Sequence, residues 1–88
     1  MKQLNWPDVL ANQTREIVEL LNNENLKSYA ENIYNGLLGG ATGSEIWGAV
    51  RLHLTQVPSR LAMPSTMDKI LKLIKEIENI YPGYFPCL

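Results

Sequence analysis

The chain has 88 residues, of which 45% are apolar and 19% charged, and its formal net charge is −1. This length suits one domain and not two, and the composition is that of a folding chain rather than a disordered one. The single cysteine, Cys87, excludes an internal disulfide, and with the single histidine, His53, it cannot supply the four ligands of a structural zinc site. We therefore expect one domain over residues 1–88, without a disulfide or a metal.

The N-terminal segment has no apolar run that could serve as a secretory signal. No stretch of the chain approaches the roughly 20 consecutive apolar residues that a membrane span needs. Together with the near absence of cysteine, these features predict a cytoplasmic, soluble protein with no membrane partner.

The first helix is predicted over residues 6–22. Asn5 can cap it, and Pro7 and Asp8 suit its first turn. Apolar residues then recur at helical spacing at Leu10, Ile17, Leu20 and Leu21. A polar run, residues 22–25, ends the pattern.

The second helix is predicted over residues 25–38, with Asn25 as its N-cap. Gly39 and Gly40 should end it, because glycine adopts the left-handed conformation that closes helices. Its apolar stripe has the clearest helical period in the chain: Leu26, Tyr29, Ala30, Ile33, Leu37 and Leu38.

The third helix is predicted over residues 43–57. Thr42 and Glu45 have the spacing of a capping box, and Pro58 disfavours helical geometry in the residue before it. Gly48-Ala49 gives this helix a face of small residues, which predicts a close approach of a neighbouring helix, or else a shallow groove for a partner. The apolar positions are Ile46, Trp47, Val50, Leu54 and Val57.

The fourth helix is predicted over residues 65–81, starting from a capping signature at Ser65 and stopping at Pro82. Its predicted apolar stripe is Met67, Ile70, Leu71, Ile74, Ile77 and Tyr81. The tail, residues 82–88, is unusually apolar, so we expect it to fold back on the domain or to meet another chain. The sequence thus predicts an all-α bundle of four short helices, mostly antiparallel, with the last one free to cross the others.

The sequence contains little that indicates a catalytic site or a cofactor site. The glycines of residues 36–44 resemble a phosphate loop, but Ser44-Glu45 follows Gly43 where a Walker motif needs Lys and then Ser or Thr. A helix cap explains these glycines better. His53 could act as a base, yet no nucleophile is tied to it by spacing. We therefore predict a protein that is not an enzyme, with no cofactor and no metal.

Nucleic acid is an alternative partner, because the second and third predicted helices could form a helix-turn-helix. The recognition helix, residues 43–56, would carry one fixed positive charge, Arg51, and would have Glu45 at its start. Phosphate contacts require a basic face. We expect nucleic acid to be an unlikely partner for this reason.

Large aromatic residues are more numerous than a thin core easily hides, and Trp and Tyr are favoured as interface anchors. We expect the third predicted helix and its borders to form a partner-contact surface. The candidate contact residues are Tyr34, Glu45, Trp47, Arg51, His53, Tyr84 and Phe85.

The segment Gly39-Gly40-Ala41-Thr42-Gly43-Ser44-Glu45-Ile46, followed by Arg51 and Leu52, resembles small uncharacterised bacterial all-α proteins, some of them similar to immunity proteins. The resemblance implies a protein that blocks a cognate toxin by binding it. It covers a third to a half of the chain and assigns no role to any residue. The alternatives are a structural homodimer, in which the tail and part of the third helix pack against their copies, and a DNA-binding regulator.

Overall fold

A computed structural model describes residues 6–39 and 43–81. It contains four helices: α1 (Trp6–Asn23), α2 (Lys27–Gly39), α3 (Gly43–Thr55) and α4 (Pro64–Ile80). The described residues include no strand. The all-α prediction is confirmed, and each helix lies within a few residues of its predicted range.

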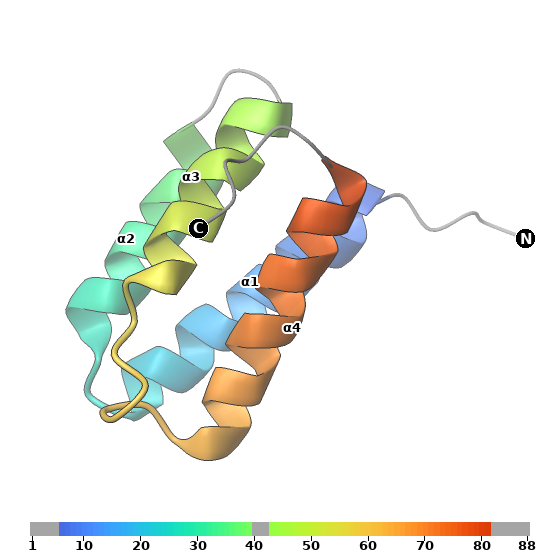
Figure 1. The fold of residues 1–88 in the computed structure, drawn as a ribbon. Helices are drawn as coiled ribbons and strands as arrows, with labels where there is room; N and C mark the ends of the chain where they lie inside the picture. Colours follow the sequence, from blue (N-terminus) through green and yellow to red (C-terminus); the bar gives the residue numbers. More distant parts are fainter. Residues whose placement is uncertain (1–5, 40–42, 82–88) are drawn as a thin grey trace, which may run out of the picture.

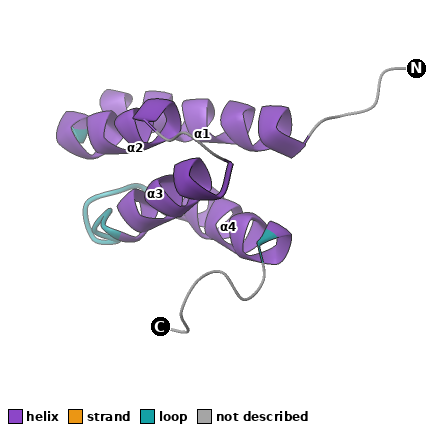
Figure 2. Ribbon diagram, turned by 90° about the horizontal axis from the view of Figure 1, so that it is seen from above, coloured by secondary structure: helices purple, strands orange, loops and turns teal. Residues whose placement is uncertain are grey.

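The helices form two layers, with α1 and α2 in one and α3 and α4 in the other (Figures 1 and 2). Successive helices run in opposite directions (Figure 1). The two layers meet where α2 packs against α3 and α1 packs against α4. The last helix runs alongside α1 rather than across the bundle (Figure 1). Among the described residues, no helix combines the length and the apolar character needed to cross a membrane.

The core lies between the two layers and receives side chains from all four helices. Two predicted core positions are wrong: Leu38 is 63% exposed and Leu71 is 58% exposed. Leu73 is buried in place of Leu71, because α4 turns its 66–70–73–77 face inward and Leu71 lies about 100° away from Ile70. The buried apolar residues are Leu10, Ile17, Leu21, Leu26, Ala30, Ile33, Trp47, Val50, Leu54, Val57, Ala62, Ile70, Leu73 and Ile77.

The turn between α1 and α2 depends on Asn25, whose φ is +61°. Its backbone N–H donates to the carbonyl of Asn22, and the N–H of Leu26 donates to the carbonyl of Leu21 at 2.9 Å. This pair of bonds is a Schellman motif, with asparagine at the left-handed position. The prediction that Asn25 caps α2 is therefore wrong, because its left-handed backbone closes α1 instead.

The start of α4 is capped by a residue from the end of α1. The N-cap is Met63, which makes no side-chain cap, and Pro64 follows it as the first helical residue. Glu24 Oε1 accepts from the Met63 backbone N–H at 2.7 Å, and Glu24 Oε2 accepts from the Thr66 hydroxyl at 2.6 Å. The predicted cap at Ser65 is wrong, because the helix begins one residue earlier. The carboxylate that caps it belongs to Glu24, in the turn that follows α1. An anion at this end also suits the helix dipole.

The end of α3 differs slightly from its prediction. The α-helix stops at Thr55. Two tighter hydrogen bonds follow, from Gln56 N–H to the His53 carbonyl and from Val57 N–H to the Leu54 carbonyl. Such turns satisfy the last carbonyls of a helix, and Pro58 prevents its continuation.

Replacing Glu24 by alanine should lower the free energy of unfolding by about 1–2 kcal/mol, because a backbone N–H and a buried hydroxyl lose a charged acceptor. Glu24→Gln should retain part of the effect. Urea unfolding of the purified protein measures both. The matched control is Glu31→Ala, which removes only an exposed pair with Lys27. Equal losses for Glu24→Ala and Glu31→Ala would show that the cap contributes nothing.

Candidate functional site

The backbones of α2 and α3 come close together at Gly36. A Cβ atom at this position would lie 3.3 Å from the Val50 backbone nitrogen, 3.3 Å from His53 Cδ2 and 3.4 Å from the Ala49 carbonyl carbon. Glycine therefore lets the two backbones approach each other here. The sequence pointed instead to Gly48, which is half-buried in α3.

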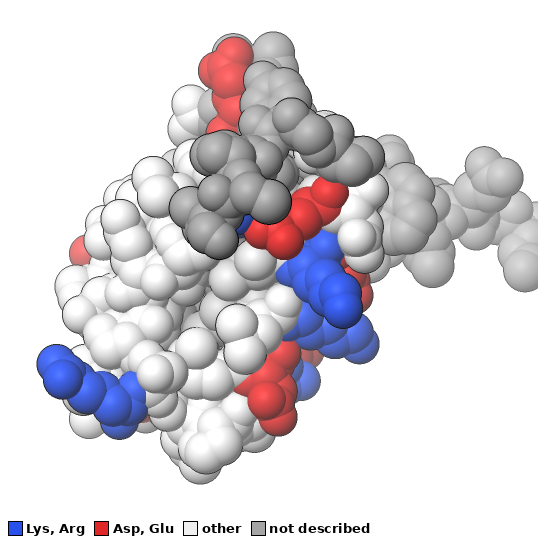
Figure 3. Space-filling model, viewed as in Figure 1, with Lys and Arg blue, Asp and Glu red and all other residues white. Residues whose placement is uncertain are grey.

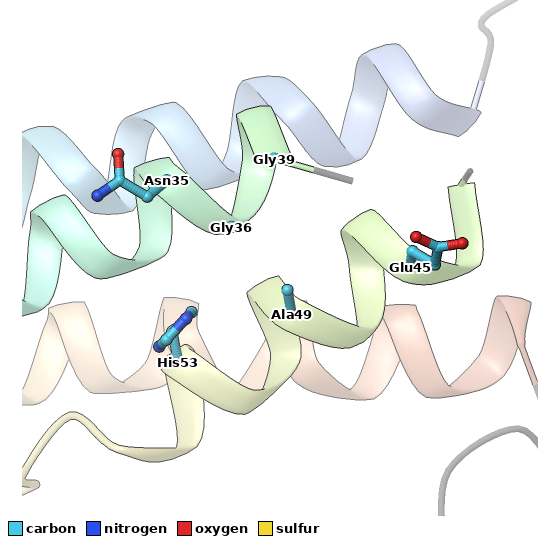
Figure 4. A pocket seen from close by; sticks show the side chains of 6 residues that line it. All are labelled: Asn35, Gly36, Gly39, Glu45, Ala49 and His53. Carbon is cyan, nitrogen blue, oxygen red and sulfur yellow. The ribbon is translucent and has the colours of Figure 1, made fainter. Parts of the chain in front are cut away.

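A shallow cavity of about 350 Å³ lies along this contact, open to solvent. We call it the α2–α3 groove (Figure 4). Gly36, Gly39 and Ala49 make its walls low, because they carry little or no side chain. Glu45 lies at one end, in the first turn of α3, and His53 at the other (Figure 4). The lining residues are Asn35, Gly36, Gly39, Glu45, Ala49 and His53.

The polar groups of the groove are an amide, a carboxylate and an imidazole. His53 Nδ1 lies 3.3 Å from Gln56 Oε1, one turn further along α3. The lining contains no hydroxyl or thiol that His53 could activate as a nucleophile. Within residues 6–39 and 43–81, no three His, Cys, Asp or Glu side chains gather as a metal site would require. This chemistry suits hydrogen bonding to a partner.

Exposed apolar side chains border the groove on both helices. Leu38 follows Asn35 by three positions on α2, and Leu52 follows Ala49 by three positions on α3, so each shares a helix face with a lining residue. They are 63% and 53% exposed. Tyr34, which precedes Leu38 by one turn, is also exposed.

The structure brings together only part of the predicted contact set. Glu45 and His53 both line the groove, whereas Tyr34 is exposed on α2 but is not among the lining residues. Trp47 is only 3% exposed and belongs to the core, so its selection as a contact residue is wrong. It occupies the inward face of α3, next to Val50. Tyr84 and Phe85 lie outside the described residues.

Arg51 is also misplaced in the predicted contact set. Its guanidinium is held by Glu78 of α4, with Nε and Nη2 each 2.7 Å from Glu78 Oε2. The Arg51 side chain is 10% exposed and that of Glu78 is 41% exposed. A long side chain on the flank of α3 reaches α4 instead of solvent, so Arg51 holds the bundle together and is not available to a partner.

Three lining residues were not predicted from the sequence to border a groove, namely Asn35, Gly36 and Gly39, whereas Ala49 belongs to the predicted small-residue face of the third helix. The signal was the spacing of three between Gly36 and Gly39, together with Gly48-Ala49 on the following helix. Small residues on two consecutive antiparallel helices indicate a close contact and a low surface beside it. The sequence pattern around Gly39 predicted only a helix cap.

Comparisons with protein-family models, with curated proteins and with solved structures found no match to this chain.

Gly36→Ala should lower the free energy of unfolding by up to about 2 kcal/mol. The added methyl group meets a helix backbone at 3.3 Å, and overpacking of this kind costs about 1–3 kcal/mol, more than the roughly 1 kcal/mol gained in helix propensity. Gly39→Ala is the matched control, because a Cβ there has nothing within 4 Å, and its stability should be unchanged or raised. Thermal unfolding compares the two. A stabilised Gly36→Ala variant would contradict the close approach.

Glu78→Ala should lower the free energy of unfolding by about 1–2 kcal/mol, because it deprives the buried Arg51 guanidinium of a charged partner. Partial exposure of Glu78 keeps the loss below that of a fully buried pair. Glu19→Ala, at an exposed position of α1, serves as the control and should change stability by less than about 0.5 kcal/mol. Chemical denaturation measures both, and indistinguishable midpoints would refute a stabilising role for the pair.

Proposed function

We propose that this protein is a small non-enzymatic binding domain whose α2–α3 groove receives another protein. Its specific role would be to block that partner by direct contact, as the resemblance to immunity-like bacterial proteins implies, with a toxin as the partner. The observation that carries the proposal is the pair of solvent-exposed leucines, Leu38 and Leu52, on the two sides of a groove with small side chains along its walls.

The groove combines the two properties that protein-binding surfaces need. Leu38 and Leu52 offer apolar area, and apolar or aromatic anchors supply most of the binding energy in protein interfaces. Asn35 and His53 offer hydrogen-bonding groups between them. An apolar side chain of the partner would enter above Gly36 and Ala49, where the groove is lowest.

The same features disfavour the DNA-binding alternative. The recognition helix would be α3, and its one fixed cation, Arg51, is buried against Glu78. No lysine or arginine lines the groove. The lining includes a carboxylate, which repels phosphate groups, and it has none of the basic side chains that phosphate contacts require.

The test is affinity capture from cells of the native source with the wild-type protein and with Leu52→Glu, followed by titration calorimetry with the purified candidate. We expect a protein that binds the wild type and binds Leu52→Glu at least about tenfold more weakly, because the charge enters an apolar contact. Leu61→Glu is the matched control, an exposed leucine outside the groove, and should bind like the wild type.

Two results would contradict the proposal. One is a set of captured proteins that is the same for the wild type and for Leu52→Glu. The other is a 20-kDa particle by light scattering that Leu52→Glu converts to the 10.0-kDa monomer, since the groove would then bind a second copy of the chain.

A further inference from the structure

A row of apolar side chains runs along α4 beside the face that this helix buries in the core. It consists of Met67, Leu71 and Ile74, which follow one another at spacings of four and three and therefore share one side of the helix. Leu71 is 58% exposed, and Met67 and Ile74 are only partly buried against the core. We call these three residues the α4 row. Exposed apolar side chains grouped on one face mark a surface for a partner.

The surroundings of the α4 row combine apolar and charged surface. Met63, the N-cap residue four positions before Met67, is also 58% exposed. Where grey atoms do not cover the layer of α3 and α4, both acidic and basic side chains lie along α4, and few lie over α3 (Figure 3). An apolar row bordered by charges of both signs is the composition of a contact between two helices.

The α4 row has the spacing of the contact positions in a two-helix coiled coil. In a heptad lettered a to g, positions a and d form the contact, and positions e and g border it. Leu71 takes position a, and Met67 and Ile74 take position d, so that Asp68 and Lys75 take position e. Both charged side chains are exposed. Among the residues that the structure describes, neither of them forms an ion pair.

The charges at the e positions favour an antiparallel pairing of α4 with a second copy of itself. In an antiparallel pair, the e positions of one helix face the e positions of the other, whereas in a parallel pair they face g positions. The g positions of α4 are Ile70 and Ile77, which are fully buried in the core of their own chain. An antiparallel pair lets Asp68 of each copy meet Lys75 of the other, which gives two ion pairs related by a twofold axis.

The same two charges select one register of that pair. When Leu71 lies level with Ile74 of the second copy, Asp68 comes opposite Lys75 of the second copy. A shift by one heptad places Asp68 opposite Asp68 of the second copy, and the reverse shift places Lys75 opposite Lys75. Like charges in these places oppose association, so the surface is complementary to itself in one arrangement.

We propose that two copies of the chain associate through antiparallel α4 helices, with the α4 row at the centre of the contact and two ion pairs between Asp68 and Lys75 at its edge. The sequence suggested a homodimer through the tail and the third helix, whereas this contact uses an exposed face of α4. No residue of the α4 row lines the α2–α3 groove. Each copy keeps its groove, and the inference does not depend on the proposed function.

Light scattering over a concentration series tests the contact. Because one helix against one helix is a small interface, the series extends to about 1 mM. We expect the wild-type mass to rise from 10.0 kDa toward twice that value, and Leu71→Glu to remain at 10.0 kDa, because a carboxylate would be buried at the centre of the contact. Leu38→Glu is the matched control, since Leu38 is also exposed but lies on α2, in the other layer, and should associate like the wild type.

Exchange of the two charges tests the orientation and the register. Asp68→Lys and Lys75→Asp should each weaken association about tenfold, because each places like charges opposite one another at both ends of the contact. The double variant should regain the wild-type affinity to within about threefold, because both ion pairs return with their signs reversed. Lys27→Asp is the matched control for net charge, on an exposed position of α2, and should associate like the wild type.

Four results would overturn the proposal. The first is a wild type that remains a 10.0-kDa monomer throughout the series, and the second is a dimer that Leu71→Glu leaves intact. The third is a double variant that associates as weakly as the two single variants, since the antiparallel register would then be wrong. The fourth is loss of association in Leu38→Glu, which would place the second copy in the α2–α3 groove.

Discussion

The fold depends on one carboxylate that joins two connections at the same end of the bundle. Glu24 stands where α1 ends, and it accepts hydrogen bonds from Met63 and Thr66 where α4 begins. The first and last helices are thereby fastened to each other, although the residues concerned lie 39 and 42 positions apart. Because Met63 offers no side-chain cap of its own, the start of α4 relies on this distant acceptor. The Schellman turn at Asn25 supports it by holding the end of α1 in a defined geometry.

The small residues between α2 and α3 account both for the close packing of these helices and for the groove beside them. Gly36 brings the two helix backbones together, and the small side chains required for that contact leave a low surface beside it. Leu38 and Leu52 then stand above this surface because each lies outside the face that its helix buries. A groove with apolar borders is thus a direct consequence of a close helix pair in a domain with a thin core.

Two ion pairs of the bundle lie away from this groove, whose lining contains one carboxylate, that of Glu45. Arg51 forms an ion pair with Glu78 between α3 and α4, and Lys69 forms one with Glu16 at 2.7 Å between α1 and α4. The first pair joins two consecutive helices and the second joins the first and last helices, and neither pair includes a residue that lines the α2–α3 groove. On the part of the α3 and α4 face that grey atoms do not cover, the surface over α3 carries few charged side chains, and both acidic and basic side chains gather along α4 (Figure 3). Binding at the groove would therefore depend on apolar contact and neutral hydrogen bonds more than on salt concentration.

The sequence alone determined the number of helices, their approximate limits and most of the core, because apolar periodicity, glycine and proline act locally along the chain. Two of the contact residues predicted from the sequence, Glu45 and His53, line the α2–α3 groove, whereas Asn35, Gly36 and Gly39 were not predicted to border one. Tertiary structure alone decided which flank of each helix is buried, since a flank is defined by two neighbouring helices. For this reason Leu73 replaced Leu71 in the core, and Trp47 and Arg51 left the predicted contact set. No sequence pattern indicated the role of Glu24, because Met63 and Thr66 come close to it only when the four helices pack together.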